Sequence, residues 1–406
     1  MELYKIGQIC DINPKTNIDI RADEQISFVP MNAVSPDGKI DLSQTIDLNA
    51  IKNYTVFKNG DVLFAKITPC MENGKGALVD KLKNGYGAGS TEFIVLRPNQ
   101  ELVKPDWLYF FLSQKAFRLH CQQHMTGSAG QKRVPPKFLA YCDIPCPSLL
   151  EQERIVTRIE ELFSQLDASV AELKTAKKWL KVYRQAVLKE AFEGALTGSE
   201  KLGTTLLGSY IEKPRYGTSK KCSYTQAEKS VEVYRIPNID YTTGQVSHQD
   251  IKYSEFSDDE IAQITLKCGD ILIIRSNGSV SLVGRAALIR EIDTKGTFAG
   301  YLMRLRLKDK SSFIPEFLLY FLQSHQARIY IENKAKSTSG VHNINSTEIS
   351  GLMVPIFQVD AQQCIVSALE SRLSVCDSIE KTVDTALQQA EALRQSVLKK
   401  AFEGRF

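Results

Sequence analysis

The chain has 406 residues, 43% of them hydrophobic, and a formal net charge of +4. This length predicts two to four domains, and because no run of 18 apolar residues occurs, we expect no membrane span and no membrane partner. Nine cysteines without a regular spacing, and an N-terminus without a signal-peptide pattern, indicate a reducing, cytoplasmic location. The small net charge excludes a uniformly basic surface, so nucleic acid would have to be bound through local basic clusters.

Residues 1–147 are predicted to form a mixed α/β domain. Short runs of β-branched and aromatic residues, each bounded by turn residues, predict strands. These expected strands are 28–30, 61–65, 76–79 and 92–96. A helix is predicted from Trp107 to Leu119, because Pro105 and Asp106 favour a helix start.

Residues 148–196 are predicted to form one long coiled-coil helix. No Pro or Gly interrupts residues 151–193, and apolar residues recur every seven positions, which is the period of a coiled-coil seam. The recurring residues are Ile159, Leu166, Leu173, Leu180 and Val187, with a companion set of Ile155, Leu162, Ser169, Ala176 and Tyr183. Such a helix is roughly 66 Å long, which suits a spacer better than a single core.

Residues 197–356 are predicted to form a second mixed domain, and residues 357–406 a second long helix. The expected strands are 271–274, 285–289 and 302–307, and the expected shorter helix is 317–332. The long helix has Leu369, Cys376, Val383, Ala390 and Val397 at the seam, with a companion set of Ile365, Arg372, Ile379, Ala386 and Leu393. Gly194 and Gly404 stand where a C-terminal helix cap is expected.

The two halves repeat each other at an offset of 210 residues. Residues 151–194 align with 361–404 without a gap, and 17 of the 44 positions are identical. A repeat of this length indicates two copies of one large module rather than a solenoid. We therefore predict an α+β fold in which two mixed α/β domains are separated by two long antiparallel coiled-coil helices, with pseudo-two-fold symmetry.

Two patterns in the first domain imitate ligand sites. Residues 85–89 resemble a cofactor-binding glycine loop, but such a loop needs a strand before it and a helix after it, so we interpret them as a hairpin turn. The other pattern is a set with spacings that could bind zinc, namely His120, His124, Cys142 and Cys146. Their counterparts 210 residues further on are not zinc ligands, so we expect no metal site in this chain.

The order of domains and helices resembles the DNA-specificity subunit of type I restriction-modification enzymes. The resemblance rests on two helix ends of the form Arg-Gln-x-Val-Leu-Lys-x-Ala-Phe-Glu-Gly, at 184–194 and 394–404. Residues 149–156 are similar to that family's motif at the helix start, and residues 216–221 to a loop near the start of its recognition domains. The second helix start, 359–362, lacks the acidic Glu-Gln-Glu form, although the resemblance covers essentially the whole chain.

The resemblance implies a non-catalytic subunit that binds double-stranded DNA. Each variable domain would read one half of a split site, while the helices set the spacing and dock two methyltransferase subunits, which motor-nuclease subunits join. S-adenosylmethionine, ATP and Mg²⁺ would be needed by these partners, and no cofactor by this chain. The sequence contains neither the Asn/Asp-Pro-Pro-aromatic motif of an amino-methyltransferase nor the Gly-x-x-x-x-Gly-Lys-[Ser/Thr] loop of an ATPase.

Polar, basic and Gly-rich segments at matching places in the two domains are the candidate DNA-reading segments. Arg and Lys can read guanine, and Asn and Gln adenine, through paired hydrogen bonds, while small residues let backbone amides approach phosphates. In the first domain the candidates are Lys66, Thr68, Asn73, Lys75, Ser128, Gln131, Lys132 and Arg133. In the second domain they are Arg215, Tyr216, Ser219, Lys220, Lys221, Arg275, Ser276, Asn277, Lys336, Ser339, His342 and Asn343.

Two other functions are open at this point. The chain could be an enzyme with its own nuclease or methyltransferase activity, which the missing motifs oppose. It could also be a two-module DNA-binding regulator or scaffold without an enzyme partner. Methyl transfer by the isolated chain would support the first alternative, and recovery of a methyltransferase bound to the chain would exclude the second.

Overall fold

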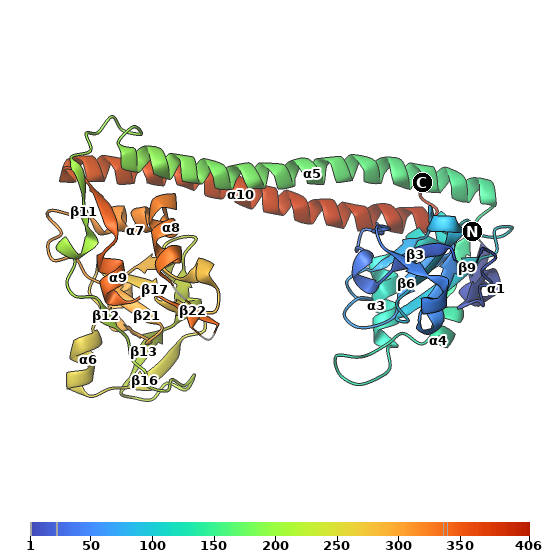
Figure 1. Ribbon diagram of the computed structural model, residues 1–406, viewed down its shortest axis with the longest axis horizontal. Coiled ribbons are helices and arrows are strands. Elements are labelled where there is room, and N and C mark those ends of the chain that lie inside the picture. Colours follow the sequence, from blue (N-terminus) through green and yellow to red (C-terminus); the bar gives the residue numbers. More distant parts are fainter. Residues whose placement is uncertain (1, 22, 336, 339) are drawn as a thin grey trace. The chain divides into compact units, whose positions relative to one another are not determined.

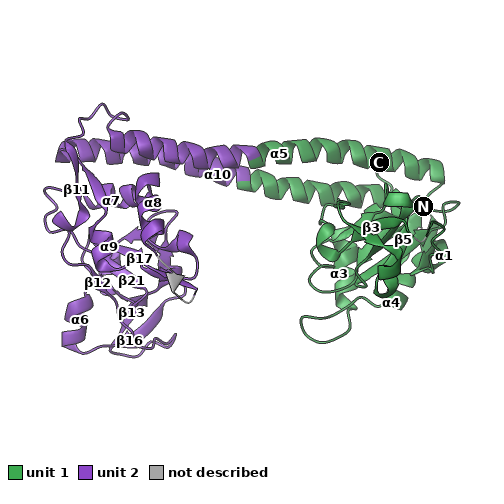
Figure 2. Ribbon diagram, viewed as in Figure 1, with its two compact units in different colours: residues 1–174, 384–406 green, residues 175–383 purple. Residues whose placement is uncertain are grey.

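The computed structural model describes residues 2–21, 23–335, 337–338 and 340–406. It divides into two compact units, Met1–Lys174 with Asp384–Phe406 (unit 1) and Thr175–Val383 (unit 2) (Figure 2). Each unit combines a β-rich domain with parts of two long helices (Figure 1). The predicted mixed α/β composition and the two long helices are therefore confirmed. Within the described residues, no helix is both long and apolar enough to cross a membrane.

Two four-stranded sheets form the centre of the domain in unit 1. The first is antiparallel in the order β2-β9-β6-β7, and the second has the order β4-β3-β8-β5, in which β3 and β8 run parallel. The bounds are β2 Cys10–Ile12, β3 Gln25–Val29, β4 Thr45–Asp47, β5 Thr55–Lys58, β6 Val62–Ala65, β7 Gly76–Leu78, β8 Tyr86–Gly89 and β9 Phe93–Pro98. A separate antiparallel pair, β1 (Glu2–Lys5) with β10 (Asp143–Cys146), precedes the first long helix.

The domain in unit 2 repeats the two central sheets and the β1-β10 pair, and it adds two small sheets. One central sheet has the order β12-β21-β17-β19, and the other has the order β16-β13-β20, in which β13 and β20 run parallel. The smaller sheets are β11-β24, β14-β15 and β18-β23-β22. The bounds are β11 Gly203–Leu206, β12 Arg215–Tyr216, β13 Ser230–Tyr234, β14 Ile239–Asp240, β15 Gln245–Val246, β16 Lys252–Glu255, β17 Ile271–Ile274, β18 Ser276–Asn277, β19 Ala286–Leu288, β20 Thr297–Phe298, β21 Leu302–Leu305, β22 Ser337–Thr338, β23 Val341–Asn343 and β24 Met353–Ile356.

The first central sheet of each domain is buried on both faces. Along β6, Val62 and Phe64 join one hydrophobic cluster, whereas Leu63 and Ala65 join another. The same alternation occurs along β17, residues 271–274. Successive side chains of a strand point to opposite faces, so a run of four apolar residues places the strand between two hydrophobic layers and fixes where the following loop begins.

The helix predicted over 107–119 and its counterpart over 317–332 are each two helices. The first region forms α2 (Pro105–Leu112) and α3 (Lys115–Gln123), and the second forms α7 (Pro315–Gln323) and α8 (His325–Lys334). Ser324 has extended backbone and its hydroxyl accepts a hydrogen bond from the Ala327 N–H, so it begins a new helix as an N-cap. The remaining short helices are α1 Ile6–Ile9, α4 Pro136–Ala140, α6 Asp258–Ile264 and α9 Ser346–Ser350.

Residues 85–89 do not form a simple hairpin turn, because Tyr86–Gly89 is strand β8 in the middle of its sheet. A Cβ atom on Gly87 would lie 2.4 Å from the Phe57 ring, and one on Gly89 would lie 2.2 Å from the Val29 carbonyl oxygen. The glycines therefore permit close packing within the sheet.

A buried ion pair is repeated in the two domains. Arg97 donates to both carboxylate oxygens of Asp61, at 2.7 and 2.8 Å. Arg306 donates to both carboxylate oxygens of Asp270, each at 2.7 Å. Both aspartates are almost completely buried, and a two-pronged pair of this kind fixes geometry as well as charge. It ties the loop before β6 or β17 to the neighbouring strand.

The long helices are α5 (Leu149–Glu193) and α10 (Val359–Phe402), and each is followed by a glycine with positive φ, Gly194 at 85° and Gly404 at 73°. Segments of the two helices pair within each unit. The seam residues Ile159, Val187, Leu369, Cys376, Val383 and Val397 are buried, and Leu166, Leu173, Leu180 and Ala390 are half-buried.

The companion sets predicted for the seam were wrong in part. Ile155 and Ile365 are buried, and Leu162 and Ala386 are half-buried, but the other six members are not. Ser169, Ala176, Tyr183, Arg372, Ile379 and Leu393 are exposed. The opposite flank closes the seam instead, through Phe163, Val170, Lys177, Arg184, Leu373, Glu380, Leu387 and Arg394. Several of these residues are charged, and their aliphatic stems cover the seam while their charged ends reach outward. Apolar spacing alone therefore selected the wrong side.

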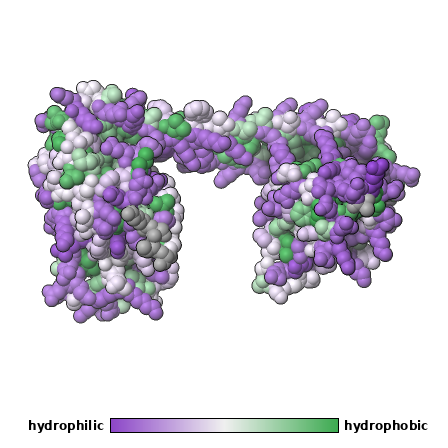
Figure 3. All heavy atoms as spheres, in the orientation of Figure 1, coloured by the Kyte–Doolittle hydropathy of each residue, from purple (hydrophilic) through white to green (hydrophobic). Residues whose placement is uncertain are grey.

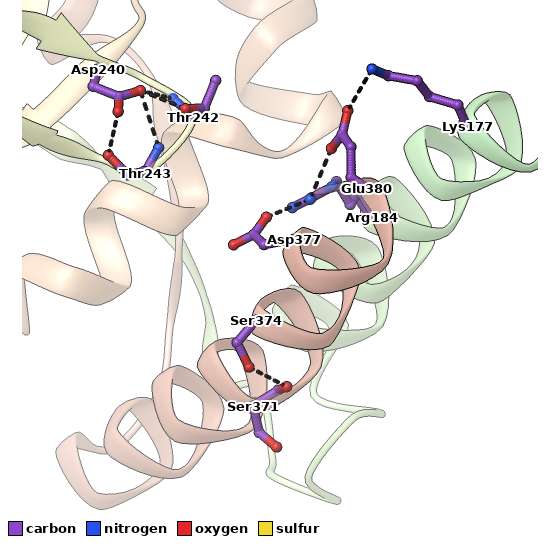
Figure 4. A network of polar contacts seen from close by, with 9 residues as sticks. All are labelled: Lys177, Arg184, Asp240, Thr242, Thr243, Ser371, Ser374, Asp377 and Glu380. Atoms are coloured by element: carbon purple, nitrogen blue, oxygen red, sulfur yellow. Dashed lines mark hydrogen bonds and ion pairs between the residues drawn. The ribbon is translucent and has the colours of Figure 1, made fainter. Parts of the chain in front are cut away.

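Two interhelical ion pairs follow the 210-residue offset. In unit 2, the Arg184 guanidinium binds Asp377 at 2.5 Å and Glu380 at 3.2 Å (Figure 4). In unit 1, Arg394 pairs with Asp167 and lies over the Phe163 ring at 4.2 Å. In unit 2, Lys177 also pairs with Glu380, and in unit 1, Arg154 also donates to the Phe406 carbonyl. In each unit, rising residue numbers along α5 therefore meet falling numbers along the C-terminal segment, so the helices run antiparallel within their unit.

Candidate nucleic-acid interface

The two polar segments predicted as DNA-reading in the first domain lie side by side. Residues 66–75 connect β6 to β7, and residues 126–133 lie between α3 and α4. The Thr68 N–H donates to the Lys132 carbonyl at 3.0 Å. Segments separated by about sixty residues in the sequence therefore form one surface.

A buried arginine supports the first of these loops. Arg118 of α3 is 5% exposed, and its guanidinium donates to the carbonyl oxygens of Met71 at 2.9 Å and Lys75 at 3.3 Å. It also lies over the Phe64 ring at 4.9 Å. Burial lowers the pKa of Arg118 to about 10, so the group remains charged at neutral pH. Charge-assisted hydrogen bonds are stronger than neutral ones, and the core thus holds the loop in a defined conformation.

The basic side chains of this surface make contacts within the domain. The Lys66 ammonium donates to the Thr91 carbonyl at 2.7 Å, and the Lys75 ammonium donates to the Met31 carbonyl at 2.7 Å. These bonds hold both amines against neighbouring segments of the domain. Four candidates, Asn73, Ser128, Gln131 and Lys132, are exposed. Their side chains are accessible to a large ligand.

Arg133 is held by an acidic residue that the sequence had not indicated. Its guanidinium donates twice to Glu92, with both nitrogen–oxygen distances at 2.9 Å. The hydrogen bonds from Arg133 hold the pKa of Glu92 below its usual range. The Thr68 hydroxyl similarly donates to Glu72 at 2.8 Å. Arg133 and Thr68 therefore shape the surface, in addition to any contact with DNA.

The same arrangement recurs in unit 2. The Ile344 N–H donates to the Arg275 carbonyl at 2.9 Å, as the Val134 N–H does to the Lys66 carbonyl at 2.9 Å. Strand β18 pairs with β23, so that Ser276 faces Asn343 and Asn277 faces His342. The structure thus brings together five of the predicted residues, Arg275, Ser276, Asn277, His342 and Asn343. Lys336 and Ser339 lie outside the described residues.

A second buried arginine supports the corresponding loop in unit 2. Arg328 of α8 donates to the Val283 carbonyl at 2.7 Å and to the Ser281 carbonyl at 3.1 Å. It follows Arg118 by 210 residues. Both domains therefore hold a variable loop by its backbone, which leaves the loop side chains free to differ between the domains.

Tyr216 joins the second loop cluster directly. The Arg275 guanidinium lies over the Tyr216 ring at 4.2 Å, and the Tyr216 hydroxyl accepts a hydrogen bond from the Ser346 N–H at 3.0 Å. Arg275 also donates to the Gly300 carbonyl at 3.3 Å. Stacking on an aromatic ring restricts the guanidinium plane, which is useful for a side chain that reads a base edge.

The remaining predicted residues of this segment differ in their surroundings. Lys220 forms an ion pair with Glu260 at 2.6 Å and lies over the Phe256 ring at 5.2 Å, so it supports the start of α6. Arg215, Ser219 and Lys221 are exposed. Among the candidates in this segment, Lys220 therefore has a structural role, because it stabilises the start of α6.

Sequence reasoning missed three residues beside these clusters, namely Glu92, Tyr301 and Arg285. The Tyr301 carbonyl accepts the Arg275 N–H at 2.9 Å, and its side chain is 63% exposed. Arg285 lies over the Tyr241 ring at 5.2 Å. The sequence signal for Tyr301 was an aromatic residue next to Gly300 at the edge of a predicted strand. Glu92 gave no such signal, since acidic residues are not expected to face DNA.

The sheet edge beside the loop differs between the domains. In unit 1 the edge strand β2 ends and the chain leaves the sheet at Asn13, whose φ is 51°. A pocket of about 470 Å³ lies between residues 13–17 and Lys66. In unit 2 the edge strand continues, and Tyr216 pairs with Met303. The first domain thus offers a hollow beside Lys66, whereas an aromatic ring lies beside Arg275.

Within the part of the chain that the structure describes, no group of three or more His, Cys, Asp or Glu side chains could hold a metal ion. The His124 ring stacks on Phe138 with centroids 4.3 Å apart, and its Nδ1 lies 3.0 Å from the His120 carbonyl oxygen. The two histidines therefore have contacts that need no zinc.

The chain is similar to known proteins over nearly its whole length. The family model "Type I restriction modification DNA specificity domain" matches residues 1–177 and again 216–389. A type I restriction enzyme specificity subunit from Salmonella potsdam is 28% identical over 94% of this chain and 82% of its own length. The EcoAI specificity subunit of Escherichia coli is 42% identical over 49% of this chain and 33% of its own length. A solved structure from the assembly of a type I restriction-modification system aligns with a TM-score of 0.77 at 21% identity, covering 100% of this chain and 98% of that one.

Proposed function

The chain belongs to the family of type I restriction-modification DNA specificity proteins, and from this membership we propose that its two variable domains each read one half of a bipartite double-stranded DNA site. The observation that carries the proposal is the repeated pair of polar loops, held in each domain by a buried arginine. A loop fixed through its backbone can present different side chains without loss of position, which is what two readers of different half-sites require.

The chemistry of the loop residues supports direct reading of base edges. Asn73, Gln131 and Asn277 carry amides that can pair with adenine, and Arg275 can pair with guanine. Lys132 and the small residues around Ser128 are suited to phosphate contacts. Base-edge contacts would select the sequence, and phosphate contacts would set the orientation of each domain on the duplex.

The long helices are proposed to set the spacing between the half-sites and to dock two methyltransferase subunits, which motor-nuclease subunits would join. The chain itself would be non-catalytic, and S-adenosylmethionine, ATP and Mg²⁺ would serve the partners. Helices of 45 and 44 residues support this role, because helices much longer than a domain core can offer surface to other proteins.

The test compares the purified chain alone with the chain plus the methyltransferase subunit of the same system. With labelled S-adenosylmethionine, we expect no methyl transfer by the chain, and adenine methylation at one bipartite sequence when both proteins are present. Methylation by the chain alone would show that it is an enzyme. Sequence-specific DNA binding without any association with the methyltransferase would instead favour a DNA-binding regulator or scaffold.

A further inference from the structure

Helix α5 carries large apolar side chains on its outer surface within unit 2. Trp179, Val182 and Tyr183 are 66%, 57% and 47% exposed. Residues three and four positions apart lie on the same face of a helix, so the three side chains form one patch. Exposed aromatic and aliphatic residues that cluster in this way mark interaction sites more often than ordinary surface.

Helix α10 extends the same patch. Val375 and Ile379 are also exposed, and the ion pair between Arg184 and Asp377 places this part of α10 level with the α5 residues. Tyr183 and Ile379 each follow a seam residue by three positions, and in an antiparallel pair equivalent flanks lie on one side of the seam. We call these five residues, Trp179, Val182, Tyr183, Val375 and Ile379, the helix strip.

The helix strip is not needed for the pairing of α5 with α10. In unit 2 the seam already contains Leu180, which is half-buried, and Cys376 and Val383, which are buried. The flank of Arg184 contributes the ion pairs shown in Figure 4. In Figure 3, hydrophobic residues interrupt the otherwise hydrophilic visible surface of the long helices.

The α5 side of the helix strip is rich in basic residues. Between residues 175 and 189, α5 contains no Asp or Glu. It contains five basic residues, Lys177, Lys178, Lys181, Arg184 and Lys189. Lys177 and Arg184 pair with carboxylates of α10, which leaves Lys178, Lys181 and Lys189 as the cations beside the helix strip. An apolar patch bordered by cations is complementary to an amphipathic helix whose apolar face is bordered by carboxylates.

The counterpart of the helix strip in unit 1 lacks this character. The residues at the 210-residue offset are Gln389, Ala392, Leu393, Gln165 and Ser169. The matching segment, 385–399, carries two basic residues, Arg394 and Lys399, and one acidic residue, Glu391. The two halves of the helical region are therefore symmetric in backbone and seam, but different in the outer surface that they offer.

We infer that the helix strip docks an acidic amphipathic helix of one methyltransferase subunit, so that the two methyltransferase subunits bind this chain with different affinities. The inference rests on the proposed function, which supplies the partner, and goes beyond it in making the two docking positions unequal. Trp and Tyr dominate the energetics of protein interfaces, so the subunit at unit 2 binds first and the subunit at unit 1 second.

The experiment titrates the methyltransferase subunit of the same system into the full-length chain and counts bound subunits by native mass spectrometry. We expect two steps, with the first dissociation constant at least about tenfold lower than the second. Trp179→Glu should weaken the first step by about tenfold or more, the size expected for loss of an aromatic hot spot. The matched control is Gln389→Glu, which introduces the same residue at the equivalent position of unit 1 and should leave the tighter step unchanged.

A fluorine label separates docking from a general loss of structure. The chain has two tryptophans, of which Trp107 is buried and donates to the Pro145 carbonyl at 2.9 Å. With 5-fluorotryptophan in this chain alone, the Trp179 resonance should shift when the first methyltransferase binds, while the Trp107 resonance should remain in place and report an intact fold.

Three other outcomes would contradict either the helix strip or the proposed function. Two equal binding steps, or Trp179→Glu behaving like Gln389→Glu, would overturn the helix strip and leave the proposed function standing. A wild-type chain that bound DNA but no methyltransferase would remove the proposed function itself. If Trp179→Glu weakened DNA binding in the absence of methyltransferase, the helix strip would be a nucleic-acid contact instead.

Discussion

Lys66 and Arg275 occupy the same place in the two domains and have different side chains. Each is the first residue after its central strand, and each backbone N–H bonds a carbonyl 26 residues later at 2.9 Å, that of Glu92 or Tyr301. Lys is a compact point charge, whereas Arg is a planar fork that binds guanine through two hydrogen bonds. A shared backbone therefore presents two chemically different readers at one position.

The first prediction concerns this pair of residues. Arg275→Ala should relax one half of the methylated DNA motif and leave the other half unchanged, and Lys66→Ala should do the converse. A good two-pronged base contact contributes about 1–3 kcal/mol of discrimination against the wrong base. Sites that differ from the original motif at one base pair of the affected half should therefore also become methylated. Methylome sequencing of cells that carry each variant with the methyltransferase measures both halves at once.

An exposed basic residue provides the control for that experiment. Arg215→Ala removes a charge from the same domain as Arg275, and loss of a phosphate contact should weaken binding to all sequences equally. If Arg275→Ala behaved in this way, or altered both half-sites, then Arg275 would not be a base reader.

The second prediction concerns pH and the loop that carries Arg133. Arg133 holds the pKa of Glu92 below its usual value, so the carboxylate is favoured in the folded state. A lowered folded-state pKa adds stability above the unfolded pKa, and that stability is lost as the pH falls through the folded-state pKa. Hydrogen exchange in residues 126–133, corrected for intrinsic rates, should therefore accelerate as the pH falls below about 4.3, the ordinary pKa of a glutamate.

Two variants distinguish this ion pair from general acid unfolding. Glu92→Gln should weaken protection of residues 126–133 already at neutral pH and flatten the acid-dependent change. Glu101→Gln, at an exposed position of the same domain, should keep the wild-type profile. Equal profiles for both variants would mean that Glu92 does not fix the loop.

At the scale of elements, a buried glutamine joins each long helix to its domain. The Gln152 side chain accepts the Lys104 N–H at 2.8 Å and donates to the carbonyls of Leu102 at 2.9 Å and Pro147 at 2.8 Å. Gln362 makes the same three bonds 210 residues later, with Ile314, Ser312 and Phe357. Both glutamines are 0–1% exposed, so no water replaces a lost partner easily.

The third prediction follows from these bonds. Gln152→Leu keeps the side-chain volume but leaves three backbone groups without their partner, and each buried unsatisfied group costs about 1–3 kcal/mol. Urea unfolding followed through the emission of buried Trp107 should show a lower free energy of unfolding. Gln363→Leu, at an exposed position of the other long helix, should not change it, and a Gln152→Leu protein as stable as wild type would contradict the role of the junction.

The long helices and their main seam could be predicted from the sequence, because an uninterrupted heptad pattern over 45 residues allows few alternatives. The second flank of the seam could not be predicted, because it is closed by charged residues. Lys177 and Arg184 cover it with their aliphatic stems while their charged ends reach Glu380 and Asp377. The break between α2 and α3 was missed for a related reason. Ser113 and Gln114 are compatible with a helix, and only the tertiary packing of Phe111 and Phe117 shows the turn.

The candidate loops could be found from the 210-residue offset, because polar segments recurred at equal distances in both copies. The contact between the two loops of one domain could not be predicted, because it depends on long-range backbone hydrogen bonds such as that from Thr68 to Lys132. The sequence also could not show which basic residues are used within the domain. Glu92 and Glu260, which bind Arg133 and Lys220, are far from them in the chain.

At the scale of the whole molecule, the end of α10 packs on the domain of unit 1. Phe402 lies 4.3 Å from Trp107 and 5.4 Å from Phe111 between ring centroids, and Gln395 accepts the Lys115 N–H at 2.8 Å. The residues of α10 that make this contact are Arg394, Gln395, Val397, Leu398, Ala401 and Phe402. The end of α5 has the same residue type at every equivalent position, Arg184, Gln185, Val187, Leu188, Ala191 and Phe192.

The fourth prediction is that a fragment of residues 1–200 forms a homodimer. Each copy contains the domain of unit 1 together with α5, and the end of α5 from the other copy can replace the end of α10 residue for residue. Asp167 would then pair with Arg184 of the other copy, as it does with Arg394 in the intact chain. With the methyltransferase, such a dimer should direct methylation to a palindrome built twice from the first half-site, and light scattering and methylome sequencing measure the two results.

The weak point of that dimer is electrostatic, and it provides the sharpest test. In the intact chain Lys177 and Arg184 share Glu380, whereas the equivalent position in α5 is Val170, so the dimer lacks this carboxylate. Val170→Glu restores the carboxylate at the position of Glu380 and should lower the dissociation constant, whereas the charge-neutral Val170→Gln should not. A fragment that stays monomeric, or one that Val170→Glu weakens, would show that the two long helices cannot substitute for each other.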